Sequence, residues 1–221
     1  MSYVRWPDRR AAGIALAGEL SDFKDADPVV VGLPRGGVEV ADEVARGLGA
    51  PLEIVVVRKV GAPGQPELGI GAVGSGGVVY INQPLVNRMG ISPDSLERLV
   101  ASTSEEVEAR LGRWVGDRDE PPLEGRTVIV VDDGLATGGT AKAAERVLRA
   151  HKPARLVLAI PVCPPESVEP LLEIYDDVVV LATPRPFLAV GEHFDNFSQV
   201  GDDDVRDILD EASRRWIAAD E

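Results

Sequence analysis

Short apolar runs alternate with amphipathic stretches along most of the chain. The apolar runs are rich in valine and isoleucine, and they cover residues 28–33, 52–57, 128–131, 155–161 and 178–181. Runs of this kind are typical of strands that are buried on both faces of a parallel sheet. The amphipathic stretches have apolar residues at helical spacing, and they cover residues 8–23, 38–48, 141–149, 167–175 and 205–219. This alternation predicts an α/β fold: an open, mainly parallel β-sheet of about five strands with helices on both faces.

Three further stretches do not fit the alternation. Residues 69–73 and 78–81 are apolar on either side of a Gly-Ser-Gly-Gly sequence, which predicts a β-hairpin. The preceding residues 60–68 are rich in glycine and proline, which predicts a flexible loop. Residues 84–115 have a helical pattern, with Ser92 and Pro93 starting the longer helix. Its charged run is expected to form a solvated face, and the run comprises Glu105, Glu106, Glu108 and Arg110.

The net charge narrows the range of partners. The 221 residues include 37 acidic and 23 basic side chains, a net charge of −14. Nucleic-acid backbones are bound by clustered Lys and Arg, so this balance argues against a nucleic-acid partner, whereas a small anionic ligand needs only local positive groups. No apolar run reaches the roughly 20 residues that span a bilayer, and the first ten residues have no apolar signal core. We therefore expect no membrane partner.

Cysteine usage gives an expectation for the compartment. Cys163 is the only cysteine, so no intrachain disulfide can form. A buried structural thiol is its expected role. A chain without disulfides is expected in the reducing cytoplasm.

Residues 128–140 carry the most informative pattern, VIVVDDGLATGGT. A buried strand ends at Asp132 and Asp133, and a loop of small residues then leads into a helix. The N–H groups and the dipole at a helix N-terminus favour a phosphate, to which Thr137 and Thr140 add hydroxyl donors. Two carboxylates beside a phosphate suit sugar hydroxyls or a hard cation such as Mg²⁺. The motif therefore indicates a phosphorylated sugar, because its spacing matches neither a Walker loop nor a dinucleotide fingerprint.

A second loop is expected at the same edge of the sheet. The strand at residues 28–33 is followed by Pro34, Arg35, Gly36 and Gly37, and parallel sheets bind ligands at the carboxyl ends of their strands. Gly36 and Gly37 would let a second anion approach the backbone, and Arg35 could form a fork onto it. A simple turn between a strand and a helix is the alternative.

Residues 128–140 closely resemble the phosphoribosyl-pyrophosphate (PRPP) motif of type I phosphoribosyltransferases, and the resemblance extends over about residues 29–181. It implies that Asp132 and Asp133 contact the ribose hydroxyls and also Mg²⁺, through water or through PRPP. It implies that the 5′-phosphate is held by the loop Ala136, Thr137, Gly138, Gly139 and Thr140. The diphosphate would be bound by Arg35, Gly36, Gly37, Arg58 and Lys59.

The family also has a mobile loop that closes over PRPP and a small hood that covers the base. Residues 60–68 stand in the place of the mobile loop, with Glu67 as a candidate polar group. The catalytic candidates are Asp132, Asp133, Lys59 and Glu67. Residues 183–201 are in a plausible place for the hood, and Phe187 and Phe194 are its candidates for contacting the acceptor. Packing of these aromatics against the sheet edge is the open alternative, and His193 as a catalytic base is less favoured.

The resemblance predicts a single phosphoribosyltransferase-like domain over residues 1–221. Its expected parts are a core at about 26–182, a helical insertion at about 84–116, a hood at about 183–201 and a C-terminal helix at about 204–219.

The implied reaction is displacement of diphosphate from C1 of PRPP by a nitrogen acceptor, which we expect to be a nucleobase, with Mg²⁺ as the cofactor. Ala136 stands where family members acting on 6-oxopurines tend to carry an acid, so that acceptor class is not favoured. One alternative is a PRPP-binding regulatory protein without transferase activity. Another is a hydrolase or phosphorylase of a related sugar phosphate. The family commonly forms dimers, so the resemblance implies a homodimer.

Overall fold

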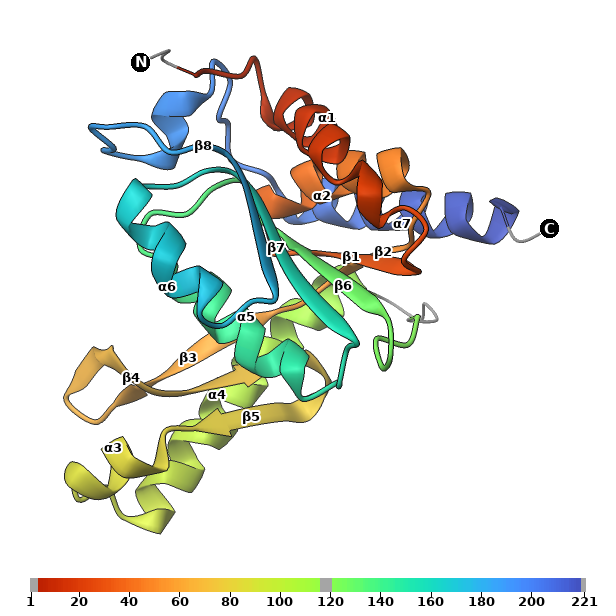
Figure 1. Ribbon diagram of the computed structural model, residues 1–221. Helices are drawn as coiled ribbons and strands as arrows, with labels where there is room; N and C mark the ends of the chain where they lie inside the picture. Colours follow the sequence, from red (N-terminus) through yellow and green to blue (C-terminus); the bar gives the residue numbers. More distant parts are fainter. Residues whose placement is uncertain (1–3, 116–120, 220–221) are drawn as a thin grey trace.

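Five parallel strands form the central sheet of the computed structural model, which describes residues 4–115 and 121–219 (Figure 1). The sheet has the order β2-β1-β6-β7-β8. Its strands are β1 (Pro28–Gly32), β2 (Leu52–Ile54), β6 (Thr127–Val131), β7 (Arg155–Val162) and β8 (Asp177–Ala182). In the register of the three neighbouring strands, Val30 of β1 pairs with Leu52 of β2 and with Ile129 of β6. The predicted α/β fold with a parallel sheet is confirmed.

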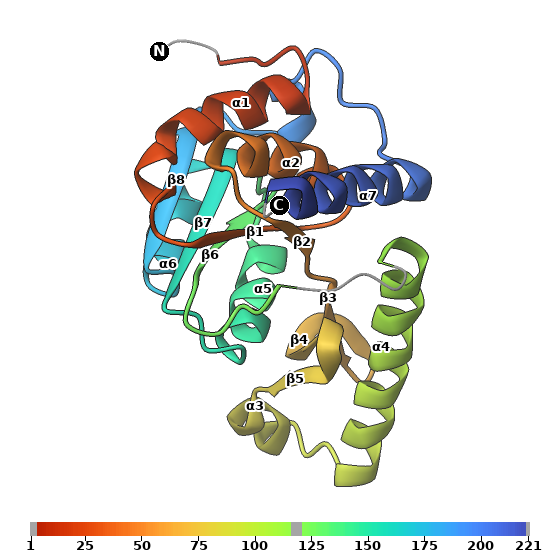
Figure 2. The ribbon, with the colours of Figure 1, turned by 90° about the vertical axis from the view of Figure 1, so that its right-hand side faces the viewer.

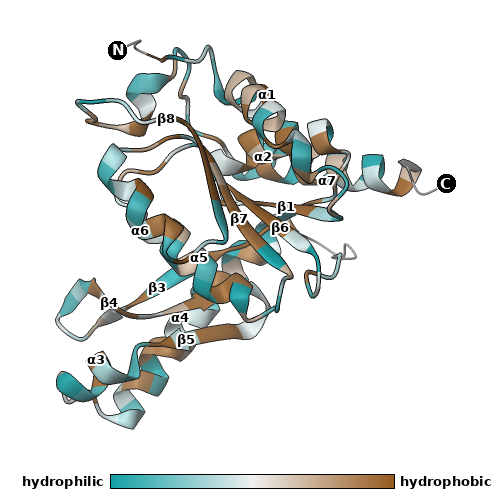
Figure 3. Cartoon of the chain, viewed as in Figure 1, coloured by the Kyte–Doolittle hydropathy of each residue, from teal (hydrophilic) through white to brown (hydrophobic). Residues whose placement is uncertain are grey.

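Helices cover both faces of this sheet (Figure 1). On one face lie α1 (Arg9–Glu19), α2 (Gly36–Leu48) and α7 (Asp202–Ala219), and on the other lie α5 (Gly139–Arg149) and α6 (Val168–Leu172). Successive strand residues point to opposite faces, so Val30 and Ile129 pack in the cluster with α2, whereas Val29 and Val128 pack in the cluster with α5. The strands are therefore mostly apolar (Figure 3), although β6, β7 and β8 each begin with a polar residue.

A second, antiparallel sheet lies beside the first. It consists of β3 (Val57–Ala62), β4 (Gln65–Gly74) and β5 (Val78–Ile81). The chain then forms α3 (Gln83–Arg88) and α4 (Pro93–Trp114), whose N-terminal amides are capped by the side chains of Asn82 and Ser92. This sheet is packed between α4 and α5 (Figure 2). The predicted hairpin and the predicted helical stretch at 84–115 are thus both present.

Two local expectations were wrong. Residues 52–57 do not form one strand: Val55 N–H still bonds to Gly32 O of the main sheet at 3.3 Å, whereas Val56 O accepts from Ser75 N–H beside the small sheet at 3.0 Å. A β-branched run pairs equally well in either sheet, so the sequence does not reveal the division. Residues 60–68 are not a loop but most of the β3–β4 hairpin, whose register shifts around Gly61. Glycine is favoured at such bulges because a Cβ at Gly61 would meet Pro66 O at 2.6 Å.

The described residues also form four short 3-10 segments, and α6 is shorter than the helix predicted at residues 167–175. The 3-10 segments are η1 (Ser21–Phe23), η2 (Ser75–Gly77), η3 (Pro165–Ser167) and η4 (Val190–His193). Helix α7 begins at Asp202, two residues before the predicted start. Its first turn therefore contains three consecutive aspartates, whose negative charge is favourable at the positive end of the helix dipole. Cys163 is buried as expected, and burial raises the pKa of its thiol to about 11. None of the helices in the described residues is long and apolar enough to cross a bilayer.

Candidate active site

The helices that follow the two neighbouring central strands, β1 and β6, lie on opposite faces of the sheet. β1 is followed by α2 on one face, and β6 is followed by α5 on the other (Figure 1). Loops that diverge in this way leave a crevice at the carboxyl ends of the strands, and this is where α/β sheets bind ligands. Both predicted ligand loops, residues 34–37 and 132–140, leave the sheet at this point.

The acidic pair lies directly against the N-terminus of α2. A Cβ on Gly36 would be 2.0 Å from Oδ2 of Asp133, and a Cβ on Gly37 would be 2.8 Å from Cα of Asp132. Only glycine permits this approach. The positive end of the α2 dipole therefore faces the two carboxylates, where it favours negative charge.

Arg9 of α1 reaches the same pair from the other side. Its Nε donates to Asp133 Oδ2 at 2.7 Å, and its Nη1 donates to Ser198 O at 2.8 Å. The guanidinium group lies 3.9 Å from the ring centroid of Phe197, and Nη1 is 3.7 Å from Glu39. The Arg9 side chain is only 7% exposed, so its charge is held by these contacts and not by water. Arg9 thus joins α1, the acidic pair and the 183–201 segment.

The sequence pattern predicted α1 only as a packing helix, and the role of Arg9 was missed. A signal was present, because Arg9 lies on the same helical stripe as the buried Ala12, Gly13 and Leu16. An arginine on an apolar stripe needs a buried partner.

Burial raises the pKa of both carboxyl groups of the acidic pair, and the effect is larger for Asp132. The pKa of Asp132 is raised well above its usual range, first by burial and then by the neighbouring charge of Asp133. The pKa of Asp133 is also raised by burial, although the hydrogen bond and the charge of Arg9 oppose the shift. Asp132 Oδ1 in turn accepts from the backbone N–H of Asp133 at 2.9 Å. A ligand that donates hydrogen bonds or brings positive charge would offset the cost of burying these carboxylates.

The loop after the acidic pair ends in the N-terminus of α5. Gly138 takes the left-handed conformation, with φ +71°, and precedes the first helical residue Gly139. The Tyr175 hydroxyl donates to Ala141 O at 2.7 Å and so fixes the first turn. Thr137, Gly139 and Thr140 line a cavity of about 600 Å³. The N-terminus of an eleven-residue helix, with two hydroxyls beside it, suits a phosphate group.

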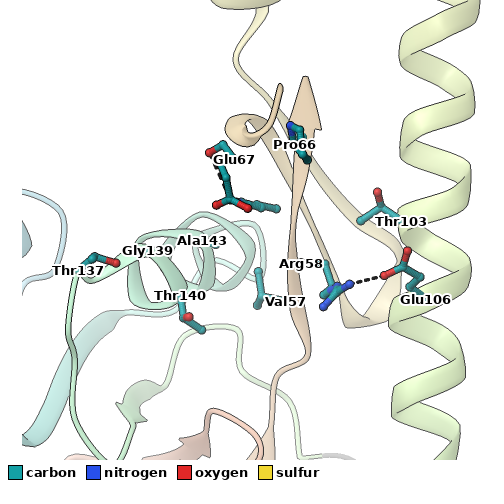
Figure 4. Close-up of a pocket in the computed structure, with 12 residues that line it drawn as sticks. Val57, Arg58, Pro66, Glu67, Thr103, Glu106, Thr137, Gly139, Thr140 and Ala143 are labelled. Carbon is teal, nitrogen blue, oxygen red and sulfur yellow. Dashed lines mark hydrogen bonds and ion pairs between the residues drawn. The ribbon is translucent and has the colours of Figure 1, made fainter. Parts of the chain in front are cut away.

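Basic residues of the small sheet line the same cavity (Figure 4). The sequence suggested that Arg58 and Lys59 follow a strand of the main sheet. Instead, both residues lie within β3 of the small sheet. Lys59 Nζ donates to the Glu67 carboxylate of β4 at 2.6 Å, and Arg58 forms an ion pair with Glu106 of α4. Glu106 lies on the solvated face as expected, with its side chain 52% exposed, and it also lines this cavity together with Thr103.

Arg35 does not share that cavity lining. It lines a second cavity, together with Arg110, Arg113 and Asp202. The predicted diphosphate ligands are therefore divided: Arg58 and Lys59 face the larger cavity, and Arg35 faces the smaller one.

The aromatic residues at 183–201 are mostly used for packing. Phe194 is 2% exposed and lies between Trp6 and Phe197, with ring centroids 5.7 and 5.0 Å away. Its proposed contact with an acceptor is therefore wrong for this structure, because its ring has no free face. Phe187 stacks on His193 at 5.5 Å. His193 is buried with Nδ1 3.2 Å from Val4 O, which is a packing position.

Comparison with known proteins is informative along most of the chain. The model of the phosphoribosyl transferase domain matches residues 2–187. Two Mycobacterium tuberculosis proteins, from strains CDC 1551 and H37Rv, are each described as "Putative phosphoribosyl transferase", and each is 45% identical over 212 residues, or 96% of this chain. This chain spans about half the length of these curated relatives, 48% of each.

Two solved structures are similar to this chain in fold. The crystal structure of the TT1426 protein from Thermus thermophilus has 44% sequence identity and a TM-score of 0.88, over 95% of this chain and 100% of that one. The AQ2163 protein from Aquifex aeolicus has 15% identity and a TM-score of 0.50 over 91% of this chain and 84% of that one, which shows the fold alone. The family model covers most of the chain, and the chain therefore belongs to the phosphoribosyltransferase domain family.

Proposed function

We propose that the protein transfers the 5-phosphoribosyl group from PRPP to a nitrogen acceptor and releases diphosphate. In this reaction a C1–N bond forms, the C1–O bond to diphosphate breaks, and the acceptor nitrogen loses its proton. The observation that carries the proposal is the acidic pair, held at the crevice between β1 and β6 and followed along the chain by a helix terminus that suits a phosphate.

Each end of the sugar phosphate has a complementary group. Asp132 and Asp133 would accept hydrogen bonds from the ribose hydroxyls, which offsets the burial that raises their pKa. Ala136, Thr137, Gly138, Gly139 and Thr140 would hold the 5′-phosphate at the N-terminus of α5. Arg9 would fix Asp133 for this contact through its 2.7 Å hydrogen bond.

Mg²⁺ fits this site as an ion that arrives with the substrate. Within the described ranges, no group of three or more His, Cys, Asp or Glu side chains forms a closed metal cluster. Two neighbouring carboxylates are nonetheless the donors that Mg²⁺ takes when substrate phosphates provide the remaining ligands. When bound, the ion offsets negative charge on the leaving diphosphate.

The β3–β4 hairpin would exclude water from the bound sugar. Lys59 and Gly61 of the hairpin line the larger cavity. Glu67 of the hairpin lines it too, together with Thr137 and Thr140 (Figure 4). Water would otherwise capture a cation-like ribosyl group, so closure of this hairpin protects the transfer. Binding of the substrate would exchange Lys59 from Glu67 to a phosphate oxygen, which leaves Glu67 free as a polar group.

Release of diphosphate from Mg²⁺-PRPP tests the proposal, measured across a panel of purine, pyrimidine and pyridine bases with PRPP binding followed in parallel. Release with one base would establish the transferase and identify its acceptor. Binding without release for every base would favour the PRPP-binding regulator, and no binding would contradict both. A nucleobase acceptor and a homodimer remain predictions.

A further inference from the structure

Charged side chains make up most of the lining of a second, smaller cavity. It has a volume of about 290 Å³ and is lined by Pro34, Arg35, Arg110, Arg113, Trp114 and Asp202. Three arginines and one carboxylate therefore share one space, in a protein whose net charge is −14. The volume is near the lower bound for pockets that bind small ligands.

Two of the arginines converge on one carboxylate. Nη1 of Arg35 is 3.6 Å from Oδ1 of Asp202, and Nη1 of Arg113 is 3.6 Å from Oδ2 of the same residue. At 3.6 Å each contact is longer than a hydrogen bond, so charge attraction holds the group. Asp202 thus occupies the position that an oxyanion ligand would take between two guanidinium groups.

The walls of the cavity are held in place from both sides. Arg206 of α7 donates from Nε to Arg113 O at 3.3 Å and from Nη2 to Asp203 at 2.9 Å, which ties the end of α4 to the first turn of α7. The two helices meet at this point (Figure 2). Arg110 and Arg113 lie on the same stripe of α4 as Thr103 and Glu106, which line the larger cavity.

The chain connects the smaller cavity to the acidic pair through Arg35, which lines this cavity. Arg35 directly precedes Gly36, which lies against Asp133. In PRPP the diphosphate is attached at C1, next to the hydroxyl-bearing carbons of the ribose. A ribose whose hydroxyls contact Asp132 and Asp133 therefore has its diphosphate close to the residue before Gly36.

We propose that Arg110 and Arg113 of α4, together with Arg35, form the binding site for the diphosphate group of the sugar substrate, and that Asp202 is an internal anion which the diphosphate displaces. The assignment rests on the proposed function. A diphosphate carries more charge and more acceptor oxygens than one carboxylate, and Arg forks match such oxygens in pairs. The same anion chemistry is offered by a free phosphate or nucleotide, so the test must separate the two sources.

Calorimetric titration can distinguish the diphosphate of the sugar substrate from a free anion. The three ligands are inorganic diphosphate, PRPP and ribose 5-phosphate, each with Mg²⁺. The variant is R110Q/R113Q, and the matched control is Arg98→Gln, an exposed arginine on the same helix but away from this stripe. The double variant is expected to lose at least about tenfold in affinity for diphosphate and PRPP, with ribose 5-phosphate and the control unchanged. Asp202→Asn is expected to bind diphosphate more tightly than the wild type, because it removes the competing charge.

Three results would overturn the proposal. Unchanged affinities in R110Q/R113Q would remove the cavity from the site. A loss for inorganic diphosphate with unchanged PRPP affinity would assign the cavity to a free anion. Wild-type protein that binds diphosphate through these arginines but does not bind PRPP would contradict the proposed function and the assignment to the sugar substrate, and would leave an anion site of another purpose.

Discussion

The Nε atom of Arg9 donates a hydrogen bond of 2.7 Å to Oδ2 of Asp133 across 124 positions of sequence. The two side chains are only 7% and 14% exposed, so this is a buried ion pair. It connects the first helix of the chain to the carboxylates that follow β6. Because Arg9 also donates to Ser198 O and lies over Phe197, the pair determines how the 183–201 segment meets the proposed ribose site.

Replacement of Arg9 by Met should lower both stability and ligand affinity. Removing one partner of a buried pair leaves the other charge without compensation, at a cost of about 3 kcal/mol in the free energy of unfolding. Urea denaturation and calorimetry with Mg²⁺-PRPP would measure the two effects. Arg9→Lys should restore part of the stability because it keeps the charge.

The matched control for Arg9 is its neighbour. Arg10 is 55% exposed and pairs with Glu43 at 3.2 Å, so Arg10→Gln should change the free energy of unfolding by less than about 1 kcal/mol. If Arg9→Met behaved like Arg10→Gln in both measurements, the coupling through Asp133 would be wrong.

Asp132→Asn should separate binding from stability. Asparagine can keep the acceptor oxygen for the N–H of Asp133 while it removes a charge that burial disfavours. We expect a loss of at least about a hundredfold in affinity for Mg²⁺-PRPP, from one lost contact to hydroxyls and metal, with no loss of stability. Retained affinity would contradict the role of Asp132 at the ribose.

The stability of Asp132→Asn relative to the wild type should depend on pH. The folded pKa of Asp132 is raised above its unfolded value, so the folded state binds the proton more tightly. The contribution of this group to stability is therefore greatest in acid and is lost as the pH rises from about 4, the unfolded value, through the raised folded pKa. Denaturation from about pH 4 to about pH 7 should show Asp132→Asn gaining stability relative to the wild type; a constant difference would contradict the raised pKa.

Gly36→Ala should damage the site by a steric effect. Its Cβ would lie 2.0 Å from Oδ2 of Asp133, so the acidic pair or α2 must move. We expect PRPP binding to fall at least about tenfold and stability to fall by about 1–3 kcal/mol. Gly18→Ala is the control: a Cβ there meets no atom within 4 Å, and alanine in α1 should stabilise by about 0.5–1 kcal/mol. Equal behaviour of the two variants would show that the close approach is unimportant.

Lys59→Ala tests the hairpin. Lys59 and Glu67 are 46% and 93% exposed, so the loss of their pair should change stability by less than about 1 kcal/mol. Turnover or affinity for Mg²⁺-PRPP should fall by about tenfold, because a cation facing the larger cavity is lost. Kinetics equal to those of Lys24→Ala, an exposed lysine between η1 and β1, would place Lys59 outside the reaction.

The sequence predicted the fold well because parallel strands and their helices are local patterns. The apolar runs at β1, β6 and β7 each predict a strand from a few consecutive residues. The acids and small residues after β6 predict a ligand loop in the same local way. Residues 52–57 show the limit, since a β-branched run fits either sheet and tertiary pairing divides it between Val55 and Val56. The β3–β4 hairpin shows another limit, because glycine and proline at a bulge resemble those of a loop.

The candidate site could be predicted only where it is local. Asp132, Asp133 and the loop to Thr140 form one motif, but Arg9 joins them from the first helix and Arg110 lies on α4. Such contacts depend on packing between distant elements, for which a single sequence gives only weak signals. Phe194 shows the reverse error: its residue type suits a base, and only its burial beside Trp6 reveals a packing role.

The central claim is that the crevice between β1 and β6 binds PRPP. Calorimetric titration of the wild-type protein with Mg²⁺-PRPP tests it most directly, with Asp132→Asn as the comparison. We predict one PRPP per chain, competition by ribose 5-phosphate, and loss of binding in the variant. Absence of binding by the wild type, or equal binding by Asp132→Asn, would contradict the claim.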